Sequence, residues 1–259
     1  MTESARRTIR KGVRIAGFAL VTGTLLPLYV TREKLARPEG RGKVRDRWVR
    51  RWSHSLLRLF SIDVDVAPPA ATRSPSGAGQ LVVANHRSAL DIGILLRHFG
   101  GHMVSRADLA GWPLVGAAAR SVGTVFVDRA STSSGASTIR AVRELLRQGE
   151  TVIVFPEGTT FEGDVVRPFL PGAFIGALTT NATVVPVGIA YETGSGAAFV
   201  GEAFVSHLSR MAGSGRTRVA VRVGEPMAVP RTAKAKDLAD AAREAVQTLA
   251  LAARSAVDG

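Results

Sequence analysis

The chain has 259 residues, of which 46% are hydrophobic and 21% charged, so extensive disorder is excluded. It has no cysteine, which excludes disulfides, thiolate metal sites and a cysteine nucleophile. The net charge of +13 suggests a nucleic-acid partner, but its distribution does not. Residues 1–60 hold 15 Lys and Arg against 4 Asp and Glu, whereas residues 61–259 hold 19 against 17. The excess positive charge therefore belongs to the N-terminal segment, and we expect no nucleic-acid partner.

The first predicted element is an apolar run over 15–30, with basic residues on both sides. As a helix this run would be about 24 Å long, which is short of the hydrocarbon core of about 30 Å. Spanning segments usually carry their basic residues mainly on one side. The symmetric flanks therefore favour a segment that dips into one leaflet, with both ends on the cytoplasmic side. A signal peptide is disfavoured because no small-residue cleavage site follows the run.

A second helix is predicted over 44–59. Its apolar residues recur at spacings of four, four, four and three, and they are Val44, Trp48, Trp52, Leu56 and Leu59. Two tryptophans on the apolar side with arginines elsewhere are typical of an interfacial helix. The alternative is a helix packed on the domain core with solvated arginines. We predict that residues 1–60 form a two-helix anchor that binds anionic lipid, monotopic or peripheral, at the cytoplasmic face of the inner membrane.

The remainder, residues 61–259, alternates strand-like and helix-like stretches. Strands are predicted over 62–66, 81–84, 124–127, 151–155, 183–190 and 217–223, and helices over 89–99, 107–119, 134–148, 173–180 and 233–253. This alternation predicts an α/β domain with a mixed, largely parallel central sheet flanked by helices. The segment over 67–79 is rich in Pro, Gly, Ser and Ala and is predicted to be a surface connector.

One motif stands at the end of the predicted strand over 81–84. Asn85 and His86 follow the strand, and Asp91 comes five residues after His86, just inside the next predicted helix. A histidine at a strand end lies at the sheet edge where open α/β sheets bind ligands. A carboxylate on the next turn can accept the Nδ1 proton and raise the basicity of Nε2. The pair predicts a general base that needs no protein nucleophile, although the spacing alone also fits a structural His–Asp contact.

A second motif follows the predicted strand over 151–155. The sequence continues as Pro156, Glu157, Gly158 and Thr159. Glycine permits close approach of the backbone to a ligand, and the amides after it can donate to an oxyanion or a phosphate. Taken alone, the same residues also fit an ordinary turn.

Taken together, the two motifs resemble those of the lysophosphatidic acid (1-acylglycerol-3-phosphate) acyltransferase family. Two further blocks, one ending at Arg129 and one over 184–189, agree with the family in order and spacing. The stretch over 105–116 also resembles the family's segment between the first two blocks. The resemblance covers residues 80–190 and implies the glycerol-3-phosphate acyltransferase-like fold. A basic two-helix N-terminal motif is likewise a feature of this family.

The resemblance also implies roles for individual residues. His86 is the expected general base and Asp91 orients it, while acyl-CoA or acyl-carrier protein serves as co-substrate. Backbone donors near Gly158 hold the oxyanion, and Arg106 and Arg129 match positions that bind the acceptor's phosphate. The expected substrate-binding residues are Asn85, Arg106, Arg129, Glu157, Gly158 and Thr159. Neither a metal nor another cofactor is expected.

The sequence departs from the family pattern beside the second motif. Thr160 and Leu170 stand where the family often has Arg and Lys, with Arg167 as the candidate replacement for one of these charges. The expected reaction converts a lysophosphatidic acid to phosphatidic acid. The Thr-Thr ending also resembles the branch that acylates lyso-ornithine lipids, which is the alternative acceptor. A non-catalytic lipid-binding module is the alternative of another class, and the intact His86–Asp91 pair favours catalysis.

Overall fold

The computed structural model describes residues 2–259 except 69–76, 113, 129–130, 181 and 231. Its helices are α1 (Glu3–Leu35), α2 (Arg41–Leu59), α3 (Leu90–Phe99), α4 (Val115–Ser121), α5 (Thr132–Arg147), α6 (Ile175–Leu178), α7 (Phe204–Gly213) and α8 (Ala235–Asp258). Its strands are β1 (Ile62–Ala67), β2 (Gln80–Ala84), β3 (His102–Arg106), β4 (Val125–Val127), β5 (Thr151–Val154), β6 (Thr183–Tyr191), β7 (Thr217–Val223) and β8 (Met227–Ala228). Short 3₁₀ turns cover Pro38–Gly40, Ala107–Gly111 and Pro171–Phe174.

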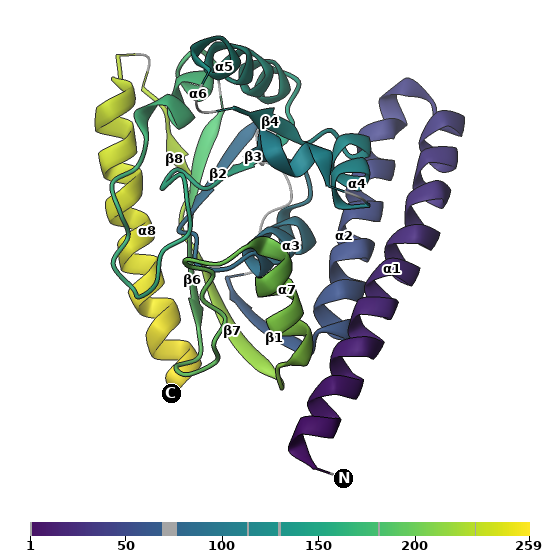
Figure 1. The fold of residues 1–259 in the computed structure, drawn as a ribbon. Coiled ribbons are helices and arrows are strands. Elements are labelled where there is room, and N and C mark those ends of the chain that lie inside the picture. The colour runs from purple at the N-terminus through teal and green to yellow at the C-terminus, as the bar shows by residue number, and fades with distance from the viewer. Residues whose placement is uncertain (1, 69–76, 113, 129–130, 181, 231) are drawn as a thin grey trace.

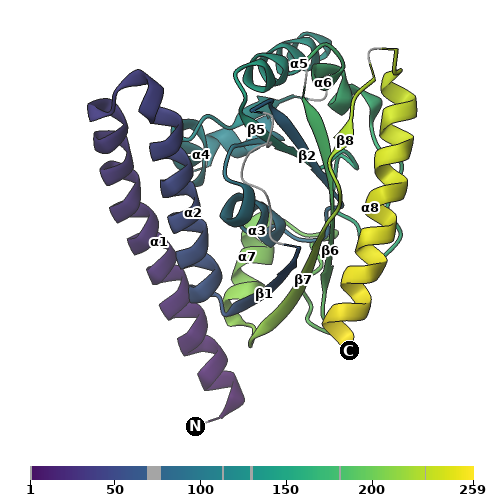
Figure 2. The same cartoon turned by 180° about the vertical axis from the view of Figure 1, so that it is seen from behind.

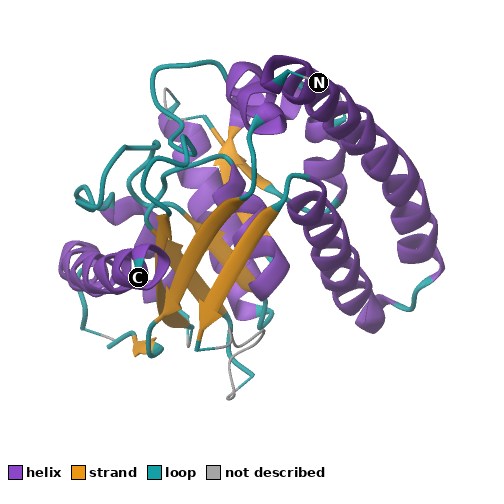
Figure 3. Ribbon diagram, turned by 90° about the horizontal axis from the view of Figure 1, so that it is seen from below, coloured by secondary structure: helices purple, strands orange, loops and turns teal. Residues whose placement is uncertain are grey.

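The strands form one sheet in the order β1-β7-β6-β2-β5-β3-β4, with β8 paired to β6. Neighbouring strands run parallel except where β7 and β8 pair with β6. Figure 3 shows the sheet between helical layers. The predicted mixed, largely parallel sheet is confirmed. Because β2 to β6 share one direction, their carboxyl ends meet at one edge, and the segments after them are brought together there.

Both faces of the central strands are buried, which explains their nearly continuous apolar sequence. Val82 and Ala84 of β2 pack in a cluster with side chains of α2 and α3, whereas Leu81 and Val83 pack in a second cluster with α5 and α8. Figures 1 and 2 show α8 and the α1–α2 hairpin on opposite sides of the molecule.

Helix α1 is longer than the apolar run that predicted it, because the basic flanks continue the helix to 33 residues. It is long and apolar enough to cross a membrane by length and composition, and little of its apolar window is buried. Large apolar side chains that are at least half exposed recur along it at spacings of four, seven, eight and seven, which places them on one face. They are Ile9, Val13, Leu20, Leu28 and Leu35, whereas Ile15, which is 47% exposed, lies off this face.

The buried face of α2 differs by one position from the predicted stripe, since Arg45, Val49, Ser53 and Leu57 are buried. Val49 and Leu57 belong to the cluster that contains Val82, so this face of α2 packs on the domain core. Trp48 and Trp52 of the predicted stripe are only half-buried. The shift has a physical cause in the ion pairs of Arg45 with Asp46 and Glu150 (2.8 and 2.6 Å), which compensate its burial.

Helix α1 also contacts the domain directly. The buried guanidinium of Arg14 donates to the Ser214 carbonyl and to the Ser61 hydroxyl, each at 2.8 Å. Ser214 directly follows α7, so a side chain of α1 satisfies a carbonyl beyond the end of a domain helix.

Several elements differ from those predicted. The helix predicted over 107–119 is divided into a 3₁₀ turn and α4, and the one over 173–180 into a 3₁₀ turn and α6. Strands β3 and β8 and helix α7 were not predicted. Strand β3 follows a pair of glycines without a polar turn, and β8 is only two residues long, so neither strand shows an alternating pattern.

Candidate active site

His86 directly follows Asn85 at the carboxyl end of β2, and its imidazole is held on two sides. Its Nδ1 atom lies 2.9 Å from Oδ2 of Asp91, which is in the first turn of α3. The ring stacks on Phe155, with the centroids 3.9 Å apart and the planes within 7° of each other. Because Nδ1 is bound to Asp91, Nε2 is the nitrogen left for a reacting hydroxyl. The side chain is 15% exposed, so a ligand can reach it.

The carboxylate of Asp91 is fully buried and is surrounded by donors. Oδ2 accepts from the amides of Arg87 (2.7 Å) and Ser88 (2.9 Å), and Oδ1 accepts from the Tyr191 hydroxyl (2.5 Å). Burial and the neighbouring carboxylate raise the pKa of Tyr191 well above its usual range, so its hydroxyl stays protonated and donates. These donors compensate the removal of Asp91 from water and fix its orientation toward His86.

Glu157 connects the two sequence motifs. Its Oε1 accepts from the amide of His86 and from Nη1 of Arg87, both at 2.8 Å, while Oε2 accepts from the amide of Arg167 at 3.0 Å. The Arg87 guanidinium also donates to the carbonyl of Gly163 at 2.7 Å. Glu157 therefore fixes the segment after β2 to the segment after β5, and its side chain is fully buried.

Asn85 likewise joins strands. Its side chain exchanges two hydrogen bonds with the backbone of Ile189 in β6, at 2.9 and 2.8 Å, and it is buried. Gly158 adopts φ +84°, in the left-handed region, and its amide donates to the Phe155 carbonyl at 3.1 Å. The next residue, Thr159, is exposed. Its amide has no hydrogen-bond partner among the described residues and is free to donate to a ligand.

A cleft of about 950 Å³ opens above His86, between the segments that follow β2, β3, β4 and β5. Of the residues predicted from sequence, His86, Arg106, Gly158 and Thr159 line it, whereas Asn85, Asp91 and Glu157 lie behind its wall. Arg106 is exposed and pairs with Asp108 at 3.0 Å. Arg129 lies outside the described residues.

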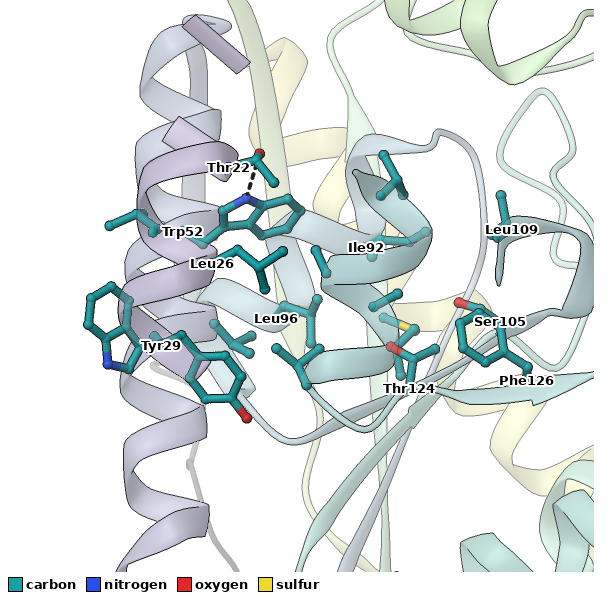
Figure 4. Close-up of a pocket in the computed structure, with 18 residues that line it drawn as sticks. Thr22, Leu26, Tyr29, Trp52, Ile92, Leu96, Ser105, Leu109, Thr124 and Phe126 are labelled. Carbon is teal, nitrogen blue, oxygen red and sulfur yellow. Dashed lines mark hydrogen bonds between the residues drawn. The ribbon is translucent and has the colours of Figure 1, made fainter. Parts of the chain in front are cut away.

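A smaller apolar pocket of about 110 Å³ adjoins the cleft between α1, α2, α3 and the sheet. Figure 4 shows Leu26 and Tyr29 of α1 on one side of it and Phe126 of β4 on the other. Ile92, Ser105 and Leu109 line both the pocket and the cleft. These three side chains therefore form a wall that the pocket and the cleft share.

The sequence of residues 69–190 matches the family described as Acyltransferase. A lyso-ornithine lipid O-acyltransferase from Pseudomonas aeruginosa is 31% identical over 251 residues, which cover 95% of this chain and 93% of that protein. A 1-acyl-sn-glycerol-3-phosphate acyltransferase from Neisseria meningitidis is 34% identical over 58% of each chain. The chain belongs to this acyltransferase family.

The fold agrees with this assignment. The crystal structure of the 1-acyl-sn-glycerophosphate acyltransferase PlsC from Thermotoga maritima superposes on the acyltransferase with a TM-score of 0.72. The two share 24% identity, and the match covers 96% of this chain and 98% of the other. The family resemblance that rested on the motifs around His86 and Glu157 is confirmed by the family match and by the Pseudomonas relative.

Sequence reasoning missed three residues that shape the candidate site. Arg87 lies between His86 and Asp91 in the first motif, yet nothing in the sequence distinguishes a buried arginine from a solvated one. Tyr191 ends β6 directly after an apolar run, which was the available signal for its position at the sheet edge. Phe155 belonged to the second motif, but its stacking on His86 depends on the pairing of β2 with β5. Within the described residues, no group of three or more His, Asp or Glu side chains is arranged to hold a metal ion.

Proposed function

We propose that this acyltransferase transfers an acyl chain from a soluble thioester, acyl-CoA or acyl-carrier protein, to the hydroxyl of a lysolipid. The observation that supports this most is the environment of His86. Its Nδ1 is bound to the buried Asp91, while its ring borders a cleft of about 950 Å³. The arrangement is that of a general base acting on a bound hydroxyl rather than on a protein nucleophile.

The reaction proceeds in two proton transfers at one nitrogen. Nε2 of His86 accepts the proton of the acceptor hydroxyl as its oxygen bonds to the thioester carbonyl carbon. Asp91 stabilises the resulting imidazolium through Nδ1–H. The amide of Thr159 is a candidate donor to the tetrahedral oxyanion. The carbon–sulfur bond then breaks, and the imidazolium returns the proton to the leaving thiolate, so the enzyme ends in its starting state.

The apolar pocket next to the cleft suits a hydrocarbon chain. Its lining is almost wholly apolar, and it borders the cleft through Ile92 and Leu109. A long acyl chain buried there would be stabilised by about 0.8 kcal/mol for each CH₂ removed from water. We propose that it receives part of the acyl chain of one substrate.

The order of the two candidate acceptors rests on the relatives. Among the charged side chains that line the cleft, Arg106 is paired with Asp108 and Glu202 with Arg210. A lyso-ornithine lipid combines an ammonium with a carboxylate, and the Pseudomonas relative named for this acceptor matches nearly the full chain. We therefore place lyso-ornithine lipid first and lysophosphatidic acid second.

Lysophosphatidic acid, the acceptor expected from the motifs, keeps specific support. Arg106 lines the cleft and is exposed, as a phosphate ligand requires, and the Neisseria relative is named for the 1-acyl-glycerol-3-phosphate acceptor. Arg129, the second phosphate ligand that the family resemblance implies, lies outside the described residues. The guanidinium of Arg167 lies 5.2 Å from the centroid of the Phe161 ring, and it is not among the residues that line the cleft.

We further propose that residues 1–60 anchor the enzyme at the cytoplasmic face of the inner membrane, while residues 61–259 carry the transfer reaction. The exposed apolar face of α1 that contains Leu20 and Leu28 supports this proposal. The net charge of the segment, from 15 basic and 4 acidic residues, supports binding to anionic lipid. The anchor is proposed to be monotopic or peripheral.

The test is transfer of a labelled acyl group by the full-length protein in anionic vesicles. We expect His86→Ala to reduce turnover by about 10²–10⁴-fold with the fold retained. Asp91→Asn should be nearly as severe because the imidazole loses its orienting carboxylate. His98→Gln, a half-buried histidine on α3 outside the cleft, is the matched control and should keep wild-type turnover near neutral pH.

Two outcomes would contradict the proposal. Turnover of His86→Ala within about threefold of wild type would exclude His86 as the base. Lysolipid binding without any acyl transfer by the wild-type enzyme would favour the non-catalytic module.

The acceptor is decided by comparing kcat/KM for lyso-ornithine lipid and lysophosphatidic acid. A preference of about tenfold or more for the phosphate acceptor, which is about 1.4 kcal/mol, would reverse our order.

A further inference from the structure

A buried hydrogen-bond network surrounds Asp91 behind His86. The Tyr191 hydroxyl donates to Oδ1 of Asp91, and the Ser88 amide donates to Oδ2 at 2.9 Å. The Ser88 Oγ atom lies 3.1 Å from Nε2 of His207 in α7. Tyr191, Ser88 and His207 are all buried, and none of them lines the cleft. They therefore act on a bound substrate only through other residues.

His207 is itself fixed from its second nitrogen. Nδ1 lies 3.1 Å from Oε1 of Glu202 and 3.0 Å from Nη2 of Arg210, and the ring packs against Phe199 with the centroids 4.7 Å apart. Burial lowers the pKa of His207 against the opposing hydrogen bond of Glu202, and Arg210 adds to the lowering, so the ring is neutral near pH 7 and carries one N–H. With an acceptor and a donor both near Nδ1, either tautomer leaves one hydrogen bond between Nε2 and Ser88.

The two oxygens of Asp91 are held by different groups. Oδ2 accepts from His86 and from the amides of Arg87 and Ser88, whereas the Tyr191 hydroxyl is the donor to Oδ1 among the described residues. Without Tyr191, a buried oxygen of a charged group would lose its donor. The carboxylate would then rotate or draw more strongly on the Nδ1–H of His86. Either change alters the orientation or the basicity of the imidazole.

We propose that Tyr191 and His207 are positioning residues that set the orientation and strength of the Asp91–His86 hydrogen bond, Tyr191 by direct contact and His207 through Ser88. This inference rests on the proposed role of His86 as general base. It assigns a task to α7, which sequence reasoning missed. It also assigns a positioning role to the hydroxyl groups of Tyr191 and Ser88, which are too deeply buried to contact a substrate.

The test combines kinetics with the resonance of the His86 Nδ1–H proton. The chain has five histidines and two tyrosines, so ¹⁵N-histidine labelling gives few signals, and His86 is assigned by its absence from His86→Gln. In Tyr191→Phe we expect kcat to fall about tenfold, which is a smaller loss than that expected for His86→Ala. The KM for the acyl donor should change by less than about twofold. The His86 Nδ1–H signal should move downfield because Asp91 has one donor fewer. A merely structural role would lower the melting temperature without moving this signal.

Matched variants separate positioning from packing. Tyr29→Phe removes the chain's other tyrosine hydroxyl, which donates to the Ser121 carbonyl, and it should leave the His86 signal unchanged. His207→Gln can still hydrogen-bond to Ser88 and should retain most of kcat, whereas His207→Leu should lose about as much as Tyr191→Phe. Should Tyr191→Phe fail to fold, the Gln and Leu variants of His207 carry the test.

Two results are decisive. An unchanged kcat together with an unmoved His86 signal in Tyr191→Phe, or equal activity of the Gln and Leu variants of His207, would overturn the positioning role. If His86→Ala is inactive in the same assay, only this inference fails. If His86→Ala remains active, the proposed function fails, and the question of positioning no longer arises.

Discussion

The buried pair of Glu157 and Arg87 gives the sharpest stability prediction. Glu157→Gln keeps the size of the side chain, but it removes the negative charge and replaces one acceptor oxygen by an amide that faces a donor. Arg87, whose side chain is 7% exposed, is then left without its counter-charge. Breaking a buried ion pair in this way typically costs about 3–5 kcal/mol. For a chain of this length that corresponds to a fall in melting temperature of about 6–20 °C.

Thermal unfolding of the full-length protein in detergent, followed by circular dichroism, measures this effect. Glu244→Gln, at an exposed position of α8, is the matched control and should change stability by about 0.5 kcal/mol or less. The double variant Arg87→Met, Glu157→Leu should be more stable than Glu157→Gln alone, because it leaves no unpaired buried charge. A melting temperature of Glu157→Gln within about 2 °C of wild type would refute the reasoning, since it would mean that the pair contributes less than about 1 kcal/mol.

Three further predictions concern the membrane face, the packing of α8 and the pH dependence of stability. Leu20→Asn in the full chain should weaken binding to anionic vesicles about tenfold or more in a sedimentation assay, whereas Leu251→Asn, exposed on α8, should not. Gly188→Ala should lower the free energy of unfolding by about 3 kcal/mol or more, because its Cβ would lie 2.2 Å from the backbone nitrogen of Ala250; urea unfolding equal to wild type would contradict this. Burial and neighbouring arginines lower the pKa of His98 from 6.5 to about 4. The folded state therefore binds fewer protons than the unfolded state between these values, so stability falls as the pH drops through this window. In His98→Gln the urea midpoint should fall less than in wild type between pH 7 and about pH 5, and an equal fall in both would contradict the assignment.

The sequence was informative where local pattern and site coincide. His86 and Glu157 could be placed together because each follows an apolar strand, and parallel strands bring such ends to one edge. The contact of Tyr191 with Asp91 joins residues one hundred positions apart and has no local signature. Buried charged side chains were the second feature that could not be predicted from the sequence. The burial of Arg45 could not be predicted, because only the packing of α2 on the domain shows that Glu150 compensates its charge.

The contact of Arg14 with the end of α7 has a consequence for protein engineering. Since a side chain of α1 satisfies backbone groups of the domain, and Val49 and Leu57 of α2 fill its core, the first sixty residues are not a removable module. We expect the whole chain to unfold as one cooperative unit. A water-soluble form of the enzyme would therefore be reached by resurfacing α1, with polar residues in place of Ile9, Val13, Leu20, Leu28 and Leu35, and not by truncation.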